Sequence, residues 1–356
     1  MRRRLVVLLA VVALVVVAVA GWFGWQAATR TTYERAVSML PESTLRATWT
    51  DWESVRSLAD GPSGRASAGD VDRFLSRAYD LDLTSTSAVV DATFVLSREF
   101  GFSPLDASWE LFGQSREGAV VLLGLPDSVD LDEVERRLEE LGYSEPADGP
   151  GSGGVWAGSA DLVATIDGSL TPVMQNVVVL PEERVVLLSD NQAYASSSAE
   201  VVTDDSDGLD SVDGVSALAS AAGEPASAVL FASDFACEAL NMSQADDSDR
   251  AVAEDLVDAA GGVHPLAGLV MAVQPDRSML VGMHFESSTQ ASEDLRPRTE
   301  LAGGEAPGQG GSFAERFRVV EAAADGNEIV MELEPATRDT PLLSDLSQGP
   351  VLFAAC

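Results

Sequence analysis

The chain opens with a long apolar run, and patterns typical of helices and strands follow it. The run from Leu5 to Trp25 carries no charge. At about 1.5 Å per residue it would span roughly 31 Å as a helix, which matches the hydrocarbon core of a bilayer. The run therefore predicts a transmembrane helix. Arginines fill positions 2 to 4 just before it, so the positive-inside rule places residues 1–4 in the cytoplasm and the rest of the chain outside.

A cleaved signal peptide is the alternative for the same segment. Ala18-Val19-Ala20 has the small-residue pattern of a cleavage site,. The apolar run is longer than the ~7–15 residues usual for a signal peptide, which favours a retained anchor. Both interpretations export residues 30–356. Residues 26–43 are predicted to form a stalk.

Alternation and helical spacing predict the elements of a first unit. From Thr44 to Trp52, apolar Leu45, Ala47 and Trp49 alternate with Arg46, Thr48 and Thr50, which is typical of a strand with one solvent-exposed face,. A helix is predicted from Asp70, its cap, to Tyr79, with an apolar stripe. The clearest helix begins at Asp130 and ends at Gly142. Hairpins are predicted around residues 114–118 and 181–184, and a further helix over 87–100.

Similar patterns return further along the chain. Residues 228–233 read as a strand, residues 248–260 as a helix with Val252, Leu256 and Val257 turned inward, and residues 274–278 and 325–327 as hairpin turns,. Residues 288–302 have weak helical character that Pro297 should interrupt. The apolar run 350–353 could close the sheet as a short strand.

The order of strand, helices, hairpin, helix and hairpin thus occurs twice. We predict an α+β fold class in which two weakly similar units follow the transmembrane helix. The first exported unit covers 44–199 and the second covers 226–356. Residues 200–225, between the two units, read as an acidic linker and a connecting helix.

The charge of the chain limits its partners. The net charge is −35, and all 22 basic residues are arginine. A strongly acidic exported region should repel nucleic acid and anionic lipid. The exclusive use of arginine suggests a high-GC bacterial source.

A set of residues in the first unit carries a resemblance to a known group of proteins. Phe100-Gly101-Phe102, then Asp106, Trp109 and Gly113, then Gly124-Leu125-Pro126 are similar to uncharacterised membrane-anchored exported proteins of high-GC actinobacteria. The resemblance implies an anchored, duplicated α+β exported region. That family has no assigned activity, so the resemblance implies no catalytic residue.

Candidate catalytic and ligand residues are few. The only histidines are His264 and His284, and neither a zinc-binding spacing nor a nucleophile elbow nor a phosphate-binding loop is present,. We therefore predict no metal, no cofactor and no catalytic residue, although a hydrolase that uses an Asp/Glu pair stays possible. Trp49, Trp52 and Trp109 could line a ligand groove, but core packing is the more frequent role.

The acidic segment from Asp204 to Gly214 resembles a calcium loop only in composition. Oxygen ligands at alternate positions suit a hard cation, but Leu209 breaks the register and no glutamate closes the loop,. A solvated linker is the preferred interpretation.

The two cysteines of the chain predict one covalent link. Cys237 and Cys356 both lie in the exported part, where disulfides persist,. We predict an intramolecular disulfide with Cα atoms within about 7 Å of each other. A buried free Cys237 and an intermolecular bond through Cys356 are the alternatives.

These observations favour a single-pass membrane protein with an extracytoplasmic domain. The predicted role is a non-catalytic binding or scaffold element of the cell envelope, held by Leu5 to Trp25, with an envelope protein or a small ligand as its partner. The alternatives are a carrier of an apolar ligand and the hydrolase above.

Overall fold

The computed structural model describes residues 30–62, 66–337 and 340–356 of the protein. The predicted cytoplasmic residues 1–4 and the predicted span from Leu5 to Trp25 lie outside these ranges. Within the ranges, no helix has both the length and the apolar character that crossing a bilayer requires.

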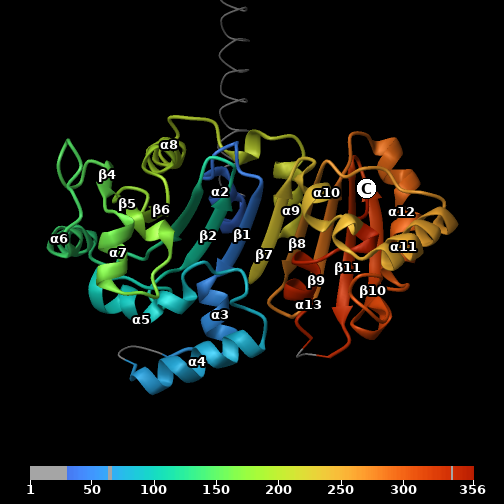
Figure 1. Cartoon of the computed structure of the whole chain (residues 1–356), viewed down its shortest axis with the longest axis horizontal. Coiled ribbons are helices and arrows are strands. Elements are labelled where there is room, and N and C mark those ends of the chain that lie inside the picture. The colour runs from blue at the N-terminus through green and yellow to red at the C-terminus, as the bar shows by residue number, and fades with distance from the viewer. Residues whose placement is uncertain (1–29, 63–65, 338–339) are drawn as a thin grey trace, which may run out of the picture.

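A single antiparallel sheet of eleven strands organises the described residues (Figure 1). The strand order is β10-β11-β9-β8-β7-β1-β2-β3-β6-β5-β4. The strands are β1 (Arg46–Asp51), β2 (Trp109–Gln114), β3 (Ala119–Gly124), β4 (Val155–Ala157), β5 (Asn176–Leu180), β6 (Val185–Ser189), β7 (Ser227–Ala232), β8 (Gly268–Val273), β9 (Met279–His284), β10 (Phe317–Asp325) and β11 (Glu328–Pro335). The antiparallel sheet and its helices form the mixed α+β fold that the sequence predicts.

The sheet has two halves that meet at its centre. Outward from the centre, the first half runs β1-β2-β3-β6-β5, with β4 added at its edge, and the second runs β7-β8-β9-β11-β10. The same strand order therefore leads away from the junction in both directions. Strands β1 and β7 join the halves by antiparallel pairing, in a register from Arg46 opposite Phe231 to Thr50 opposite Ser227. The two halves consequently share one continuous sheet.

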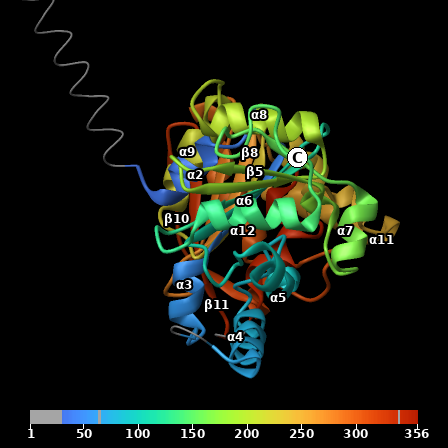
Figure 2. The ribbon, with the colours of Figure 1, turned by 90° about the vertical axis from the view of Figure 1, so that its left-hand side faces the viewer.

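Helices cover both faces of the sheet, as the edge-on view shows (Figure 2). Helices α2 (Thr32–Ser38), α8 (Gln192–Val202) and α9 (Val215–Ala222) pack on one face. The other face carries two groups, which stand apart to the left and right in Figure 1. The left group contains α3 (Trp52–Leu58), α4 (Ala68–Asp80), α5 (Thr93–Val95), α6 (Leu131–Leu141) and α7 (Ala160–Ile166), and the right group contains α10 (Phe235–Leu240), α11 (Asp247–Ala260), α12 (Ser288–Ala302) and α13 (Leu342–Ser347).

The apolar cores follow this arrangement of helices. Under α2, α8 and α9, one cluster extends over strands of both halves, and it includes Leu111 and Leu230. On the opposite face each half has its own cluster, one around Trp52 and Phe100 and the other around Phe285 and Phe353. Strand β7 contributes Val229 and Phe231 to the second of these clusters, but β1 contributes no residue to either. On that face, the apolar packing is therefore interrupted over β1.

Several predicted elements are present, with corrections at their ends and faces. Helix α6 is capped by Asp130 and ends at Gly142, as predicted. Helix α4 begins earlier than predicted, because Ser67 is its cap and Asp70 completes the capping box. Tyr79, predicted to be buried, is 76% exposed. In α11 the buried positions are Ala253 and Ala260. Leu256 and Val257 are partly buried, as their predicted inward orientation requires, but Val252 is exposed.

Three further predictions are wrong for reasons of tertiary packing. Residues 32–38 of the predicted stalk form α2, whose Val37 is fully buried in the core. Helix α12 continues through Pro297, because buried residues before and after the proline, among them Ala291 and Leu301, hold the helix in its packed position. The end of the chain forms a 3-10 turn over Leu352–Ala354 in place of a strand.

Candidate binding cleft between the two halves

A cleft of about 770 Å³ lies where the two helix groups separate, above the junction of β1 and β7. We refer to it as the central cleft. Its lining comes from both halves of the molecule. The lining residues are Leu45, Arg46, Thr48, Ser85, Thr86, Ser87, Ala88, Phe112, Gln114, Ser115, Arg116, Phe231, Phe235, Ala239, Ser347 and Gln348.

The floor of the cleft is formed by the sheet itself. Arg46 on β1 pairs with Phe231 on β7 and with Gln114 on β2, so these three residues form one row across the sheet. In the next row of the floor, Thr48 stands beside Phe112. Residues that pair across strands share a face, so the floor combines a cation, an amide, a hydroxyl group and two aromatic rings.

The polar face of β1 is buried, contrary to the prediction of a solvent-exposed face. Thr48 Oγ1 donates to the carbonyl oxygen of Thr86 at 2.7 Å, and the hydroxyl groups of Thr50 and Thr86 lie 2.7 Å apart. Residues 84–88 therefore lie across this face and form one wall of the cleft. The polar residues that alternate along β1 therefore face the cleft and the segment that covers it, and not open solvent.

A buried carboxylate supports the same wall from behind. Glu110 accepts hydrogen bonds from Ser87 Oγ at 2.7 Å, from Ala88 N at 2.6 Å and from Trp52 Nε1 at 3.0 Å. Burial raises the pKa of Glu110 above its ordinary value, and these donors act in the opposite direction. Glu110 itself is not among the lining residues. Its role in the structure is to position residues 87 and 88.

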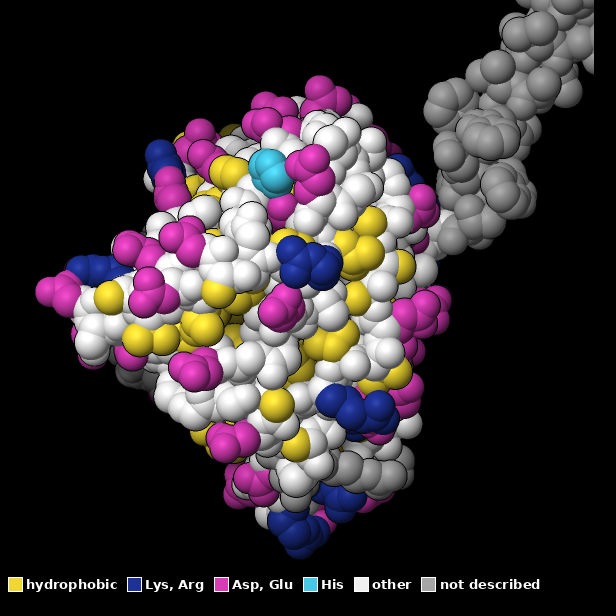
Figure 3. All heavy atoms as spheres, turned by 90° about the vertical axis from the view of Figure 1, so that its right-hand side faces the viewer, with side chains coloured by type: hydrophobic (Ala, Val, Ile, Leu, Met, Phe, Trp, Pro, Cys, Tyr) yellow, Lys and Arg dark blue, Asp and Glu magenta, His cyan; other side chains and the backbone are white. Residues whose placement is uncertain are grey.

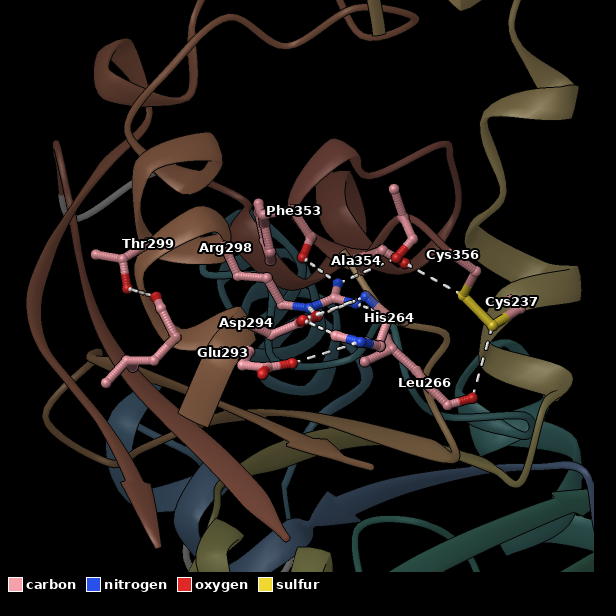
Figure 4. Close-up of polar contacts among 12 residues, drawn as sticks. Cys237, His264, Leu266, Glu293, Asp294, Arg298, Thr299, Phe353, Ala354 and Cys356 are labelled. Carbon is pink, nitrogen blue, oxygen red and sulfur yellow. Dashed lines mark hydrogen bonds and ion pairs between the residues drawn. A yellow bond between two sulfur atoms is a disulfide. The ribbon is translucent and has the colours of Figure 1, made fainter. Parts of the chain in front are cut away.

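The opposite wall is α10, which the predicted disulfide fastens. Phe235 and Ala239 of this helix line the cleft. Cys237 on the same helix forms a disulfide with Cys356, and their Cα atoms are 5.7 Å apart. The link joins the cleft wall to the end of the chain, as Figure 4 shows.

A buried ion pair holds the chain end against α12 (Figure 4). Arg298 Nε donates to Asp294 Oδ2 at 2.9 Å, and the exposed fractions of the two side chains are 0% and 2%. The same guanidinium donates to the carbonyl oxygens of Phe353 at 2.8 Å and Ala355 at 3.1 Å. Asp294 also accepts from His264, whose Nδ1 lies 2.6 Å from Oδ1. The ion pair thus braces the segment that anchors Cys356.

Two polar contacts join the first half of the molecule to the second near the cleft. Ser344 N donates to Asp82 Oδ2 at 3.0 Å, and the Ser344 hydroxyl group donates to the same carboxylate. At the hairpin between β2 and β3, Arg116 Nη2 lies 3.4 Å from Glu238 Oε1 of α10. Both side chains of this second pair are exposed, so the pair contributes only about 0–1 kcal/mol and separates easily.

The charge of the central cleft is opposite to that of the whole protein. Acidic side chains are scattered over the face shown in Figure 3, consistent with the net charge of −35. In contrast, the lining of the cleft contains Arg46 and Arg116 and no Asp or Glu. Within the described residues, no ion pair joins Arg46 to a carboxylate, and its Nε is buried without a hydrogen-bond partner. Burial lowers the pKa of Arg46, but an arginine stays protonated at neutral pH.

A second cavity, of about 880 Å³, lies beside α4 and α5. Its lining includes Pro62 and Ala66, the described residues on either side of the gap at 63–65. Its arginines are already engaged, since Arg56 donates to three carbonyl groups between residues 104 and 107. Arg98 pairs with Glu99 at 2.6 Å. The central cleft is therefore the better candidate site.

The other residues singled out in the sequence lie in structural positions. Trp52 is fully buried, and Trp49 stacks on Trp109 with ring centroids 5.7 Å apart. His284 is buried, with Nδ1 2.9 Å from Glu328 Oε1. The tryptophans therefore pack in the core and do not line the central cleft.

The residues that carry the resemblance also have packing roles. Phe100 and Phe102 are fully buried, and Gly101 has a positive φ of 83°. A Cβ at Gly124 would lie 2.1 Å from the Trp109 ring, so only glycine fits beneath that indole.

No group of three or more His, Cys, Asp or Glu side chains that could hold a metal ion occurs among residues 30–62, 66–337 and 340–356. In the acidic segment, residues 209–211 form a 3-10 turn that leads into α9. The structure thus offers no second observation in favour of a calcium site there.

Sequence reasoning did not identify Arg46 as a functional candidate. Its position in an alternating strand suggested a solvent-facing cation. The sequence did hold one signal for a role of Arg46, its place on the same strand face as Thr48 and Thr50 in a chain with few cations. Only the fold shows which segment covers that face of β1.

Comparisons with known proteins give little further information. No protein-family model matches the chain, and no curated protein matches it. Among solved structures, crystal form I of TP0453 is similar with a TM-score of 0.39 and 7% identity, over 87% of this chain and 96% of that chain. Crystal form III of TP0453 gives a TM-score of 0.38 and 7% identity, over 87% and 97% of the two chains. These values are too low to transfer a fold or a function.

Proposed function

We propose that this protein is a non-catalytic binding protein of the cell envelope. In this proposal, Leu5 to Trp25 anchors it in the membrane, residues 1–4 are cytoplasmic, and the described residues hold a small ligand outside the cell in the central cleft. The repeated strand order supports a tandem duplication of an α+β unit, with the cleft formed where the two copies meet. The disulfide supports an oxidising, extracytoplasmic location,.

The central cleft is the observation that carries the proposal. Its volume of about 770 Å³ falls within the roughly 300–1,000 Å³ typical of small-molecule sites,. The lining combines apolar side chains with a few polar groups, as ligand sites do,. Arg46 is half-buried there, and its Nε is buried without a hydrogen-bond partner. Such an unpaired group costs stability, which a pure scaffold protein has no reason to give up at this position.

The alternative functions fit the cleft less well. A hydrolase with two carboxylates needs both to converge on the substrate, and no Asp or Glu lines the central cleft. A carrier of a purely apolar ligand would leave the guanidinium group of Arg46, whose Nε has no hydrogen-bond partner, without a polar group to bind. A ligand with both polar and apolar parts matches the lining better than either.

The proposal is tested by asking what the intact protein retains when it is purified from its own membranes. Small molecules released on denaturation would be identified by mass spectrometry, for the wild type and for Ala239→Trp. The larger side chain should fill the cleft, because Ala239 is in its wall. We expect a molecule that co-purifies with the wild type and is lost from the variant. The same molecule in equal amount in both proteins would contradict binding in the cleft.

The location of the protein is tested separately by protease treatment of intact, wall-stripped cells. We expect degradation of the chain beyond residue 30. Full protection of the acidic domain would contradict the orientation, and a mature chain that starts at Gly21 would identify a cleaved signal peptide.

A further inference from the structure

We propose that the ligand of the central cleft is a small organic anion with one acidic group and an apolar portion, and that the acidic group pairs with Arg46. This inference rests on the proposed function, since it assigns a ligand class to the same cleft. It is carried by two features of the lining, a cation without a carboxylate partner and a neighbouring set of aromatic rings.

Arg46 supplies the anion-binding end of the site. The carbon atom of its guanidinium group lies 5.7 Å from the centroid of the Phe231 ring. A cation–π contact of this kind uses the face of the guanidinium group and leaves its N–H groups unused. The described residues offer these donors no carboxylate, and Nε is buried without a hydrogen-bond partner. A planar guanidinium group binds carboxylate or phosphate through two parallel hydrogen bonds.

Neighbouring polar groups can complete the contacts to an acidic group. Gln114 stands next to Arg46 in the same row of the floor, and Ser115 and Arg116 follow it at the rim. Arg116 is held only by its exposed contact with Glu238. It can therefore exchange that carboxylate for the acidic group of a ligand at little cost in free energy.

Aromatic side chains supply the apolar end of the site. Phe231 and Phe112 lie in adjacent rows of the floor, and Phe235 faces them from α10. The ring centroids of Phe231 and Phe235 are 6.4 Å apart. Phe231 is already buried, but Phe112 and Phe235 are half-buried. An apolar or aromatic body placed beside Arg46 would cover the exposed parts of Phe112 and Phe235, and the area removed from water would add to the affinity.

Because the protein is strongly acidic, the binding of an anion would distinguish a specific site from general electrostatic attraction. A chain with a net charge of −35 repels anions over its surface as a whole,. Saturable binding of an anion, with a preference over an uncharged analogue of the same shape, therefore requires a local cation. Among the described lining residues of the central cleft, Arg46 is the one set in the floor of the sheet.

The test uses three probes that share one aromatic body: 4-phenylbutyrate, 4-phenylbutyl phosphate and the uncharged 4-phenylbutanol. Titration calorimetry would measure their dissociation constants for the intact chain in lipid nanodiscs, with empty nanodiscs as the blank. The variants are Arg46→Met, which keeps the length of the side chain, and Arg318→Met. Arg318 lies on the terminal strand β10 and is largely exposed, so its replacement matches the charge change away from the cleft.

We expect at least one of the two acids to bind the wild type about tenfold or more tightly than the alcohol does, as one charge-assisted pair predicts. Arg46→Met should weaken the binding of that acid by a similar factor and leave the affinity for the alcohol unchanged. Arg318→Met should change neither affinity. The tighter of the two acids then identifies the oxyanion as carboxylate or phosphate.

Equal affinities for acid and alcohol, or an acid affinity that Arg46→Met does not change, would overturn the assignment of an anion and leave the binding function standing. Failure of all three probes to bind saturably would count against a ligand-binding cleft, and so against the proposed function itself. The ratio of acid to alcohol affinity is measured on the wild type, so the inference can be refuted even if Arg46→Met does not fold.

Discussion

Replacing Arg298 by methionine is expected to lower the free energy of unfolding by about 3–5 kcal/mol, the range found when one partner of a buried ion pair is removed. Arg298 is fully buried, and its partner Asp294 is 2% exposed. The variant would leave the Asp294 charge buried with only His264 as a polar neighbour. It would also remove the donors to the carbonyl groups of Phe353 and Ala355.

A second background separates the charge from the packing. In Asp294→Asn the carboxylate is gone, but an amide oxygen remains to accept from His264. Arg298→Met should therefore cost about 1–3 kcal/mol less in that background, because no uncompensated charge stays buried. Urea denaturation with the disulfide intact would give the four free energies. A cost below about 1 kcal/mol for Arg298→Met, or an equal cost in both backgrounds, would refute the reasoning.

Three further predictions follow from other contacts. Replacing Cys237 and Cys356 by serine should lower the stability by up to about 4–5 kcal/mol in urea denaturation, and no loss would show that the chain end is held without the disulfide. Burial raises the pKa of Glu110 above 4.5, so its contribution to stability is complete below pH 4.5 and is lost as the pH rises through the raised pKa. Glu110→Gln should flatten that decline in the free energy of unfolding, and an unchanged pH profile would contradict this. Gly214→Ala should cost about 1–3 kcal/mol more than Gly262→Ala in the same assay, because both have positive φ but only at Gly214 would a Cβ meet an imidazole, 2.3 Å away,; equal costs would contradict the clash.

Local patterns predicted the elements better than they predicted the burial of each face. The helix from Leu131 to Leu141 could be read from its cap, its stripe and its final glycine, because all three signals lie within the helix itself. The face of α4 could not be read as well, since Tyr79 fits the apolar stripe but is exposed, while its neighbour Ala78 is the buried residue at that end.

The candidate site depends on contacts between distant segments. Arg46 and Phe231 are 185 positions apart in the sequence and become neighbours only through the pairing of β1 with β7. Thr86 covers the polar face of β1 through hydrogen bonds that no local pattern contains. The cysteine pair was predictable because its evidence is compositional: there are two thiols in a region expected to be exported,.

The most direct test of the central claim is a crystal structure of the protein with 4-phenylbutyrate or 4-phenylbutyl phosphate bound. We expect the acidic group within about 3 Å of the guanidinium nitrogens of Arg46, with hydrogen bonds of the charge-assisted kind. The phenyl ring should lie against Phe112 and Phe235, the half-buried rings of the lining. A ligand bound elsewhere, or one that occupies the cleft with its acidic group turned away from Arg46, would contradict the account.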